Sequence, residues 1–217
     1  MKILIKFPTR GRREKFMQVL RLYQENIIMP DTKILVTIDD DDMSMNDRSF
    51  WNPTEQIEYE YGRSDNKVHA CNRGLKNHYF DIVILASDDM MPQVKGFDQI
   101  ISDAMLKRFP DTDGCLHFND GYTGERLQTM PIFGRKYYER FNYIYNPSYV
   151  SLWCDNEQME VAKGLNKYAY FTQILFKHEH YANNPEVKMD ERYKITESFY
   201  LQDKRTYEKR KEAGFDL

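Results

Sequence analysis

Short apolar runs that alternate with amphipathic segments restrict the fold of this chain more than any other feature. Residues 2–7, 33–38, 56–62, 81–86 and 114–119 have the length and composition of strands. Residues 12–26, 66–78 and 97–109 instead carry apolar side chains at helical spacing. Strands that alternate with helices through short connections indicate an α/β domain. The sequence therefore predicts a mainly parallel sheet flanked by helices.

The pattern changes after about residue 120. Tyrosine- and glycine-rich segments follow, then a polar helix at 155–168, a strand at 169–176 and a charged helix at about 190–212. We expect residues 121–217 to elaborate the domain begun by residues 1–120 and to pack against the same sheet.

Bulk properties narrow the class of protein. A chain of 217 residues fits one domain, and a net charge of −3 gives no general attraction to nucleic acid or anionic membrane. Three cysteines lie far apart without a CxxC pair, which supports neither a disulfide framework nor a zinc cluster. No apolar run approaches the ~20 residues that span a bilayer. We expect a soluble, cytoplasmic protein.

Three of the predicted strands end in polar clusters, at 8–13, 39–42 and 87–89. Parallel strands would bring these clusters to one edge of the sheet, where ligands of open α/β sheets collect. Carboxylates beside arginines suit a nucleotide diphosphate with a divalent cation, since Mg²⁺ and similar ions often bind one or two carboxylates plus substrate phosphates. Arg10, Arg12 and Arg13 would contact phosphates bidentately. The helix beginning near Arg12 offers unpaired N–H groups.

Simpler interpretations exist for both acidic clusters. Asp40–Asp42 is equally well explained as a solvated loop, whereas Asp39 directly follows a buried strand. An EF-hand is excluded, because Ser44 and Phe50 stand where that loop needs glycine and glutamate. The segment 87–89 could be a turn cap, but adjacent carboxylates are unfavourable without a cation, which favours a ligand site.

The ordered segments FPTRGR, ILVTIDDDD, GRSDNKVHACNRGLKN and DIVILASDDM resemble the nucleotide-sugar-binding half of GT-A-fold glycosyltransferases, most closely glycosyltransferase family 2. The resemblance covers roughly residues 1–180. It implies a Rossmann-like GT-A fold in one domain. Residues 1–120 would form its nucleotide-sugar-binding half, and residues 121–217 an acceptor-side half with the C-terminal helix.

The resemblance also implies roles for residues that bind the donor. Asp39 would hydrogen-bond uracil or an equivalent base, and Thr9 and Arg10 would line the nucleotide pocket. Lys67 belongs to the Lys/Asn-rich segment of the family, and Arg12 joins the phosphate-binding arginines.

A metal site follows from the same resemblance. Asp88 would contact the ribose or sugar, and Asp89 would ligate Mn²⁺ or Mg²⁺. The first aspartate of the common Leu-Asp-x-Asp-Asp form is Ala86 here, which leaves the shorter Ser-Asp-Asp variant. A histidine after a late strand is often a further ligand in GT-A enzymes. His178 or His180 would take that place, both on one strand face, although a solvent-facing or hydrogen-bonded histidine is an open alternative.

The segment WCDNEQMEVAKGLNKY resembles the family's Glu-Asp-x-Glu segment at a helix start, with Cys154 in place of the first glutamate. Asp155 aligns with the catalytic base, and Glu157 is the second candidate. Asp155 alternatively serves only as an N-cap, a position that aspartate favours. On the acceptor side, residues 118–144 offer Asn119, Asp120 and Arg135.

The implied reaction is inverting transfer of a sugar from a nucleotide-diphosphate sugar, a UDP-sugar first among them, to an acceptor hydroxyl. A nucleotidyltransferase is a second hypothesis, although PTRGRREK has one glycine where such enzymes carry a glycine-rich loop. A catalytically inactive nucleotide-sugar-binding module is a third. The acceptor stays open between a glycan, a small molecule, a protein and modified DNA. The basic residues of 202–212 keep DNA in consideration, although alternating charge on a helix is typical of a solvated face.

Overall fold

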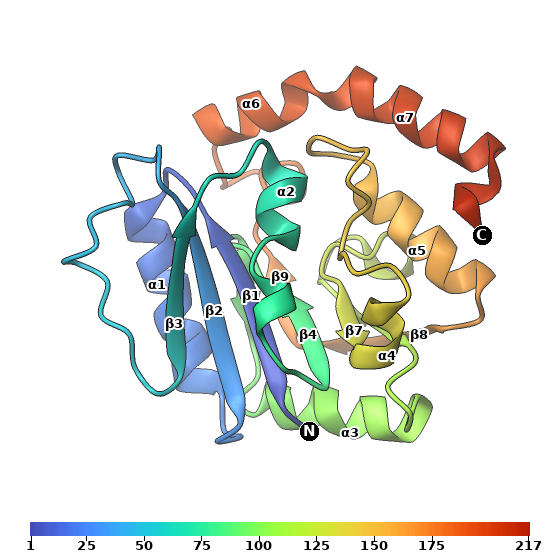
Figure 1. The fold of residues 1–217 in the computed structure, drawn as a ribbon, viewed down its shortest axis with the longest axis horizontal. Helices are drawn as coiled ribbons and strands as arrows, with labels where there is room; N and C mark the ends of the chain where they lie inside the picture. Colours follow the sequence, from blue (N-terminus) through green and yellow to red (C-terminus); the bar gives the residue numbers. More distant parts are fainter.

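A seven-stranded sheet with the order β3-β2-β1-β4-β7-β6-β8 forms the centre of the computed structural model, which describes all 217 residues (Figure 1). Every strand runs parallel to the others except β7, which is antiparallel to both of its neighbours. The strands are β1 (Ile3–Thr9), β2 (Thr32–Asp39), β3 (Ile57–Gly62), β4 (Ile82–Leu85), β6 (Cys115–Asn119), β7 (Ile132–Gly134) and β8 (Tyr168–Ile174). The predicted mainly parallel α/β sheet is confirmed.

Helices cover both faces of this sheet. The amphipathic helices α1 (Arg13–Asn26) and α3 (Phe97–Arg108) share one core with Ile3, Ile5 and Phe7 of β1. The opposite core contains Leu4 of β1 together with side chains from α2 (Lys67–Asn72), α4 (Arg135–Glu139), α5 (Cys154–Gly164) and α7 (Tyr200–Glu212). Successive residues of a strand point to opposite faces, so the apolar β1 serves both cores.

A smaller two-stranded sheet joins β5 (Met90–Pro92), just after β4, to β9 (Phe176–His178) in antiparallel register. This pairing carries the late segment of the chain back to the acidic end of β4. From there the chain enters α6 (Glu191–Ser198), which lies with α7 along one side of the molecule (Figure 1). Three short 3-10 turns complete the fold, at η1 (Leu75–Asn77), η2 (Gly124–Arg126) and η3 (Gly214–Asp216).

Several predicted elements have different boundaries in the structure. The strand expected at 169–176 is divided between β8 and β9, and the helix expected at 190–212 is divided at Phe199. The helix expected at 66–78 ends at Asn72, and Gly74 (φ +88°) starts η1. A left-handed residue of this kind ends a helix, and glycine adopts it without steric cost. No helix is both long and apolar enough to cross a membrane.

The sheet register places the predicted polar clusters at one edge. Thr9 pairs with Ile38, and Asp39 pairs with Gly62, so β1, β2 and β3 end together. The chain leaves β1 toward β2 on one side and returns to β4 on the other side. The crevice at such a reversal of strand order is the usual ligand site of an open α/β sheet.

Candidate active site

Arg12 spans the crevice between β1 and β4. It lies just before α1, and its Nη1 is 2.9 Å from Oδ1 of Asp88, beyond the end of β4. Its Nε is also 2.8 Å from Oδ2 of Asp190, at the start of α6. Burial and the neighbouring Asp89 raise the pKa of Asp88, against the opposing charges of Arg12 and Lys15. Arg12 thus presents a guanidinium group to the crevice, and a guanidinium group is well suited to bind a phosphate.

The carboxylate of Asp89 and the imidazole of His178 form a pair within the site. Nε2 of His178 lies 3.8 Å from Oδ2 of Asp89, and its Nδ1 lies 3.7 Å from Oδ2 of Asp120. Burial opposes the charged imidazole, but the two carboxylates raise the pKa of His178 to about 9. Burial likewise opposes the charged form of Asp89, yet His178 and the hydroxyl of Ser87 hold the pKa of that carboxyl well below its usual range.

A divalent cation fits the chemistry of this pair. A buried carboxylate and an imidazole come together beside Arg12, and Nε2 of His178, the nitrogen that faces Asp89, would release its proton when it binds the cation. No group of three or more histidine, cysteine or acidic side chains is arranged to hold a metal ion. The protein would therefore supply two donors, Asp89 and His178, and phosphate oxygens and water would supply the rest, as is usual for Mg²⁺.

His180 takes a different position from the one predicted. Strand β9 ends at His178, so the two histidines do not alternate along one strand face, and that prediction is wrong. Nδ1 of His180 accepts a hydrogen bond from Ala182 N at 3.2 Å, and its ring packs 4.5 Å from the rings of Tyr181 and Tyr193. Burial lowers the pKa of His180 to about 4, so it is neutral at physiological pH.

Asp155 lies in the first turn of α5, where its Oδ1 accepts a hydrogen bond from Asn156 N at 2.9 Å. It is not the N-cap, because Trp153 occupies that position with φ +64° and makes no side-chain cap bond. Burial raises the pKa of Asp155, while the positive charges of Lys67 and His178 act in the opposite direction. The half-buried carboxylate of Asp155 is therefore close enough to Lys67 and His178 for their positive charges to lower its pKa.

Glu157, two residues further along in the same first turn of α5, is fully engaged elsewhere. Arg210 donates to both of its carboxylate oxygens at 2.8 and 2.9 Å, and the hydroxyl of Tyr149 donates at 2.6 Å. The side chain is buried between α5 and α7. These partners join two helices and leave no free carboxylate oxygen that would act as a base.

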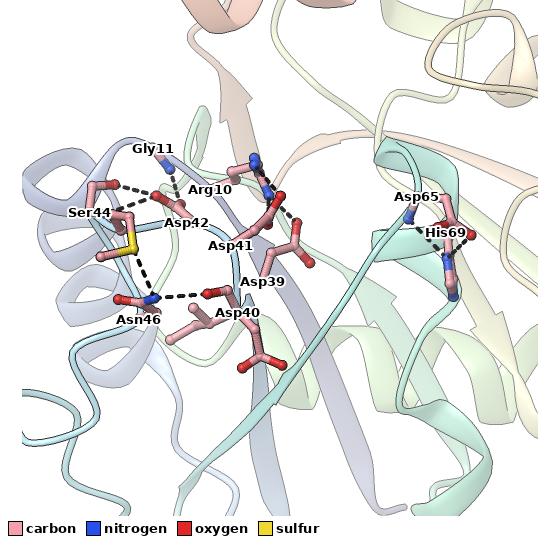
Figure 2. Close-up of polar contacts among 12 residues, drawn as sticks. Arg10, Gly11, Asp39, Asp40, Asp41, Asp42, Ser44, Asn46, Asp65 and His69 are labelled. Carbon is pink, nitrogen blue, oxygen red and sulfur yellow. Dashed lines mark hydrogen bonds and ion pairs between the residues drawn. The ribbon is translucent and has the colours of Figure 1, made fainter.

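The end of β2 forms a second polar group (Figure 2). Asp39 is buried and receives Arg10 Nη1 at 2.9 Å and Arg73 Nη2 at 3.4 Å. Asp41 is exposed and also binds Arg10, whereas Asp42 is buried and accepts a hydrogen bond from Gly11 N at 2.6 Å. The loop is therefore solvated only in part, and Arg10 is paired with carboxylates rather than free.

Other predicted positions are distributed around this edge. Thr9 ends β1 with its hydroxyl buried and without a hydrogen-bond partner, and Arg73 Nε is also buried without a partner. Such unsatisfied atoms are costly unless a ligand or water meets them. The guanidinium of Arg13 stacks 3.5 Å from the ring centroid of Phe50 instead of facing Asp88. Arg135 lies at the opposite edge, where its N–H donates to Asp81 O before β4 begins.

Tyr193 of α6 and Asp190, the N-cap of this helix, are two site residues that were not predicted from the sequence. The hydroxyl of Tyr193 donates to Oδ2 of Asp89 at 3.2 Å, and its ring lies 4.2 Å from the guanidinium carbon of Arg12. Asp190 caps α6 by accepting a hydrogen bond from Tyr193 N at 3.0 Å. Only the acidic N-cap itself is visible in the sequence as a helix start.

No protein-family model and no curated protein matches the chain, but solved structures match its fold. The mannosyltransferase PcManGT from Pyrobaculum calidifontis, in complex with GDP-Man and Mn²⁺, is 13% identical with a TM-score of 0.62, over 80% of this chain and 55% of that one. S. aureus TarS 1–349 in complex with UDP-GlcNAc is 13% identical with a TM-score of 0.63, over 82% and 58%.

A cytidylyltransferase-type structure also matches. The 4-diphosphocytidyl-2C-methyl-D-erythritol synthase from Anaerococcus prevotii is 15% identical with a TM-score of 0.54, over 92% of this chain and 96% of that one. The chain thus spans 55–58% of the length of the two glycosyltransferase structures and nearly all of the synthase. At these identities the matches define the fold. The chain has the GT-A-type fold found in glycosyltransferases.

Proposed function

We propose that the chain is a glycosyltransferase that moves a sugar from a nucleotide-diphosphate sugar to an acceptor hydroxyl. One observation carries this proposal: two pairs of oppositely charged side chains meet at the crevice between β1 and β4. They are Arg12 with Asp88 and His178 with Asp89, and the charge of His178 also acts on Asp155. The proposal includes the inverting stereochemistry and the likeness to glycosyltransferase family 2 that the sequence motifs imply.

The nucleotide would bind over the ends of β1 and β2. Asp39 would accept a hydrogen bond from the base, and Thr9 and Arg10 would line the pocket. The unpaired Thr9 hydroxyl supports this placement, because a nucleotide would supply the partner it lacks. Asp88 would contact the ribose or the sugar, and Lys67 would place a positive charge near Asp155.

The diphosphate would be bound by Arg12 together with a divalent cation at Asp89 and His178. His180 is the less suitable metal ligand, because its Nδ1 already accepts a backbone hydrogen bond. A bound Mn²⁺ or Mg²⁺ supplies Lewis-acid stabilisation of negative charge on phosphate oxygens. Arg12 adds a fixed positive charge of its own, paired in the free protein with Asp88 and Asp190.

Asp155 would act as the general base on the acceptor hydroxyl. A raised pKa brings a carboxylate closer to the working pH, and general base catalysis typically contributes about 10²–10⁴ in rate. The positive charges of Lys67 and His178 oppose the effect of burial on this pKa. Glu157 is not included in this role, because Arg210 and Tyr149 occupy it.

The preferred donor in this proposal is a UDP-sugar, and the protein would act in the cytoplasm. PcManGT is described with GDP-Man and TarS with UDP-GlcNAc, so both nucleotides belong in the first donor screen. The acceptor is a glycan, a small molecule, a protein or modified DNA.

The experiment is a thermal-shift screen of nucleotide sugars with and without Mn²⁺, followed by an assay of sugar release from each donor that binds. We expect at least one donor to raise the midpoint temperature of thermal unfolding more strongly with Mn²⁺ than with EDTA. Asp155→Asn is expected to reduce turnover by about 10²–10⁴ while donor binding persists. Binding without turnover by any donor would instead indicate an inactive nucleotide-sugar-binding module.

A nucleotidyltransferase remains the second candidate, because the cytidylyltransferase-type match covers nearly the whole of both chains. With a nucleotide sugar present to return the nucleotidyl group, such an enzyme would exchange radiolabelled pyrophosphate into a nucleoside triphosphate in the presence of Mg²⁺. A glycosyltransferase would release nucleoside diphosphate from a nucleotide sugar and would show no such exchange. The two assays separate the candidates with the same preparation of protein.

A further inference from the structure

Asp203 is a buried carboxylate for which the proposed mechanism has no role. It lies on α7 with 0% of its surface exposed and has no lysine, arginine or histidine within ion-pair distance. Its Oδ1 accepts Val150 N at 3.0 Å, and its Oδ2 accepts Ser151 N and Leu152 N, both at 2.8 Å. Three backbone donors therefore compensate a charge that would otherwise be very costly to bury.

The segment bound by Asp203 leads directly into the proposed catalytic base. Leu152 is followed by Trp153, whose φ of +64° is strained for a residue that is not glycine, and then by α5 with Asp155 in its first turn. Val150 O also accepts a hydrogen bond from Val68 N at 3.2 Å, next to Lys67 on α2. One short segment thus connects α7, the base and the helix that carries Lys67, whose charge acts on the base.

A left-handed residue at the start of a helix is held only when its surroundings determine it. No side chain caps α5, so the segment before Trp153 relies on hydrogen bonds from outside the helix. The bonds to Asp203 fix three consecutive N–H groups in one orientation, which sets the direction in which α5 begins. A change of this direction would move the carboxylate of Asp155 relative to Lys67 and His178.

We propose that Asp203 is a positioning residue that holds Asp155 in place through residues 150–152. Helix α7 would then help to position the catalytic base. This inference rests on the proposed function of Asp155. Asp203 acts on the base without contact with substrate. Displacement of a catalytic group by about 1 Å can cost roughly 100-fold in rate, so a loosened segment would reduce turnover strongly.

Asp98 provides a matched control. It is equally buried on α3, and its carboxylate accepts Met29 N at 2.8 Å, the hydroxyl of Thr32 at 2.9 Å and Ile28 N. These bonds fasten the start of β2, at the edge of the sheet opposite the site. Asp98→Asn and Asp203→Asn therefore make the same chemical change in the same kind of clamp, and only the second touches the segment before Asp155.

The test compares Asp203→Asn, Asp98→Asn and the unmodified chain by hydrogen–deuterium exchange, UDP binding with Mn²⁺ and steady-state turnover of the donor found in the screen. We expect Asp203→Asn to increase deuterium uptake at 150–157, to lower kcat by about 10–100-fold and to leave UDP affinity within about twofold. Asp98→Asn is expected to lose similar thermal stability with kcat and the uptake at 150–157 unchanged.

Equal losses of kcat in the two variants would reduce Asp203 to a general stabilising residue and overturn the proposal. Unchanged uptake at 150–157 in Asp203→Asn would overturn it as well. Failure of the proposed function has a different signature, since either no donor would be turned over or Asp155→Asn would leave turnover intact. In that case the exchange experiment still decides whether Asp203 holds the segment, because exchange does not depend on the reaction.

Discussion

Tyr193 donates a hydrogen bond to Asp89 across 104 positions of sequence, at 3.2 Å between the two oxygens. The contact brings α6 onto the acidic end of β4, where the metal and diphosphate would bind. The guanidinium of Arg12 lies 4.2 Å from the same tyrosine ring and pairs with Asp190 at 2.8 Å. In the free protein, α6 therefore occupies the two groups that a nucleotide diphosphate needs most.

Asp190→Asn is expected to strengthen the binding of UDP. The carboxylate of Asp190 competes with phosphate for Arg12, and its removal leaves Arg12 with Asp88 alone. Partly exposed ion pairs contribute about 0–1 kcal/mol, so the gain should not exceed about fivefold in Kd. Isothermal titration with UDP at low salt measures it. Glu191→Gln is the control, since Glu191 pairs with Lys194, and an equal gain there would show a general charge effect.

Asp89→Asn is expected to abolish the part of UDP binding that depends on Mn²⁺. The buried carboxylate and His178 are the two protein donors offered to the cation, and an amide is a far weaker ligand than a carboxylate. The measurement is the thermal midpoint with UDP, with and without Mn²⁺. Asp41→Asn, an exposed carboxylate at the same edge, should keep the Mn²⁺ increment. An increment that survives in Asp89→Asn would remove Asp89 from the metal site.

Much of the sheet could be predicted because its central strands are buried on both faces. β1, β2 and β4 read as mostly apolar runs, and proline or aspartate stands at or just after their ends. β5, β7 and α4 were not predicted, since elements of 3–5 residues are too short to show a period. Their positions depend on pairing with distant strands, which local sequence does not encode.

The residues of the candidate site likewise fall into those that could be predicted from the sequence and those that could not. Arg12, Asp88 and Asp89 were predictable because they follow strand ends that a parallel sheet must bring together. Asp203 and Tyr193 were not, since polar residues on charged C-terminal helices read as solvated, whereas both side chains are buried here. Their burial arises from contacts with Asp89, which follows β4, and with the loop before α5, far away in the sequence.

Glu157→Gln is expected to lower stability without lowering turnover, because Glu157 has a structural and not a catalytic role on α5. Loss of the charge breaks the buried bidentate pair with Arg210, which should lower the free energy of unfolding by up to about 3 kcal/mol. Turnover below the unfolding temperature should stay within about twofold. Asp155→Asn should show the reverse pattern, with turnover lost and stability retained. Denaturant unfolding and kcat, measured on both variants, decide the assignment, and a large loss of kcat in Glu157→Gln would return Glu157 to the candidates for the base.

Lys6→Met is expected to remove a pH dependence of stability that originates beneath the nucleotide site. Lys6 is fully buried in β1 and donates a hydrogen bond to the hydroxyl of Thr37. Burial lowers its pKa to about 7, although Cys71, Glu60 and Asp39 act in the opposite direction. The unfolded chain, with a pKa near 10.5, therefore binds more protons than the folded protein between these two values.

Stability must then rise with pH through this window, by at most about 1.4 kcal/mol per pH unit from this group. Methionine has a similar length and no charge, so Lys6→Met should lack that slope between pH 7 and pH 9. Free energies of unfolding from urea titrations at these two pH values measure the difference. Lys33→Met on the neighbouring strand is the control, because the Lys33 amine reaches an exposed carbonyl at Glu55. Parallel pH profiles for the unmodified chain and Lys6→Met would show that Lys6 stays protonated inside the protein, held by Asp39 and Glu60 more strongly than burial opposes it.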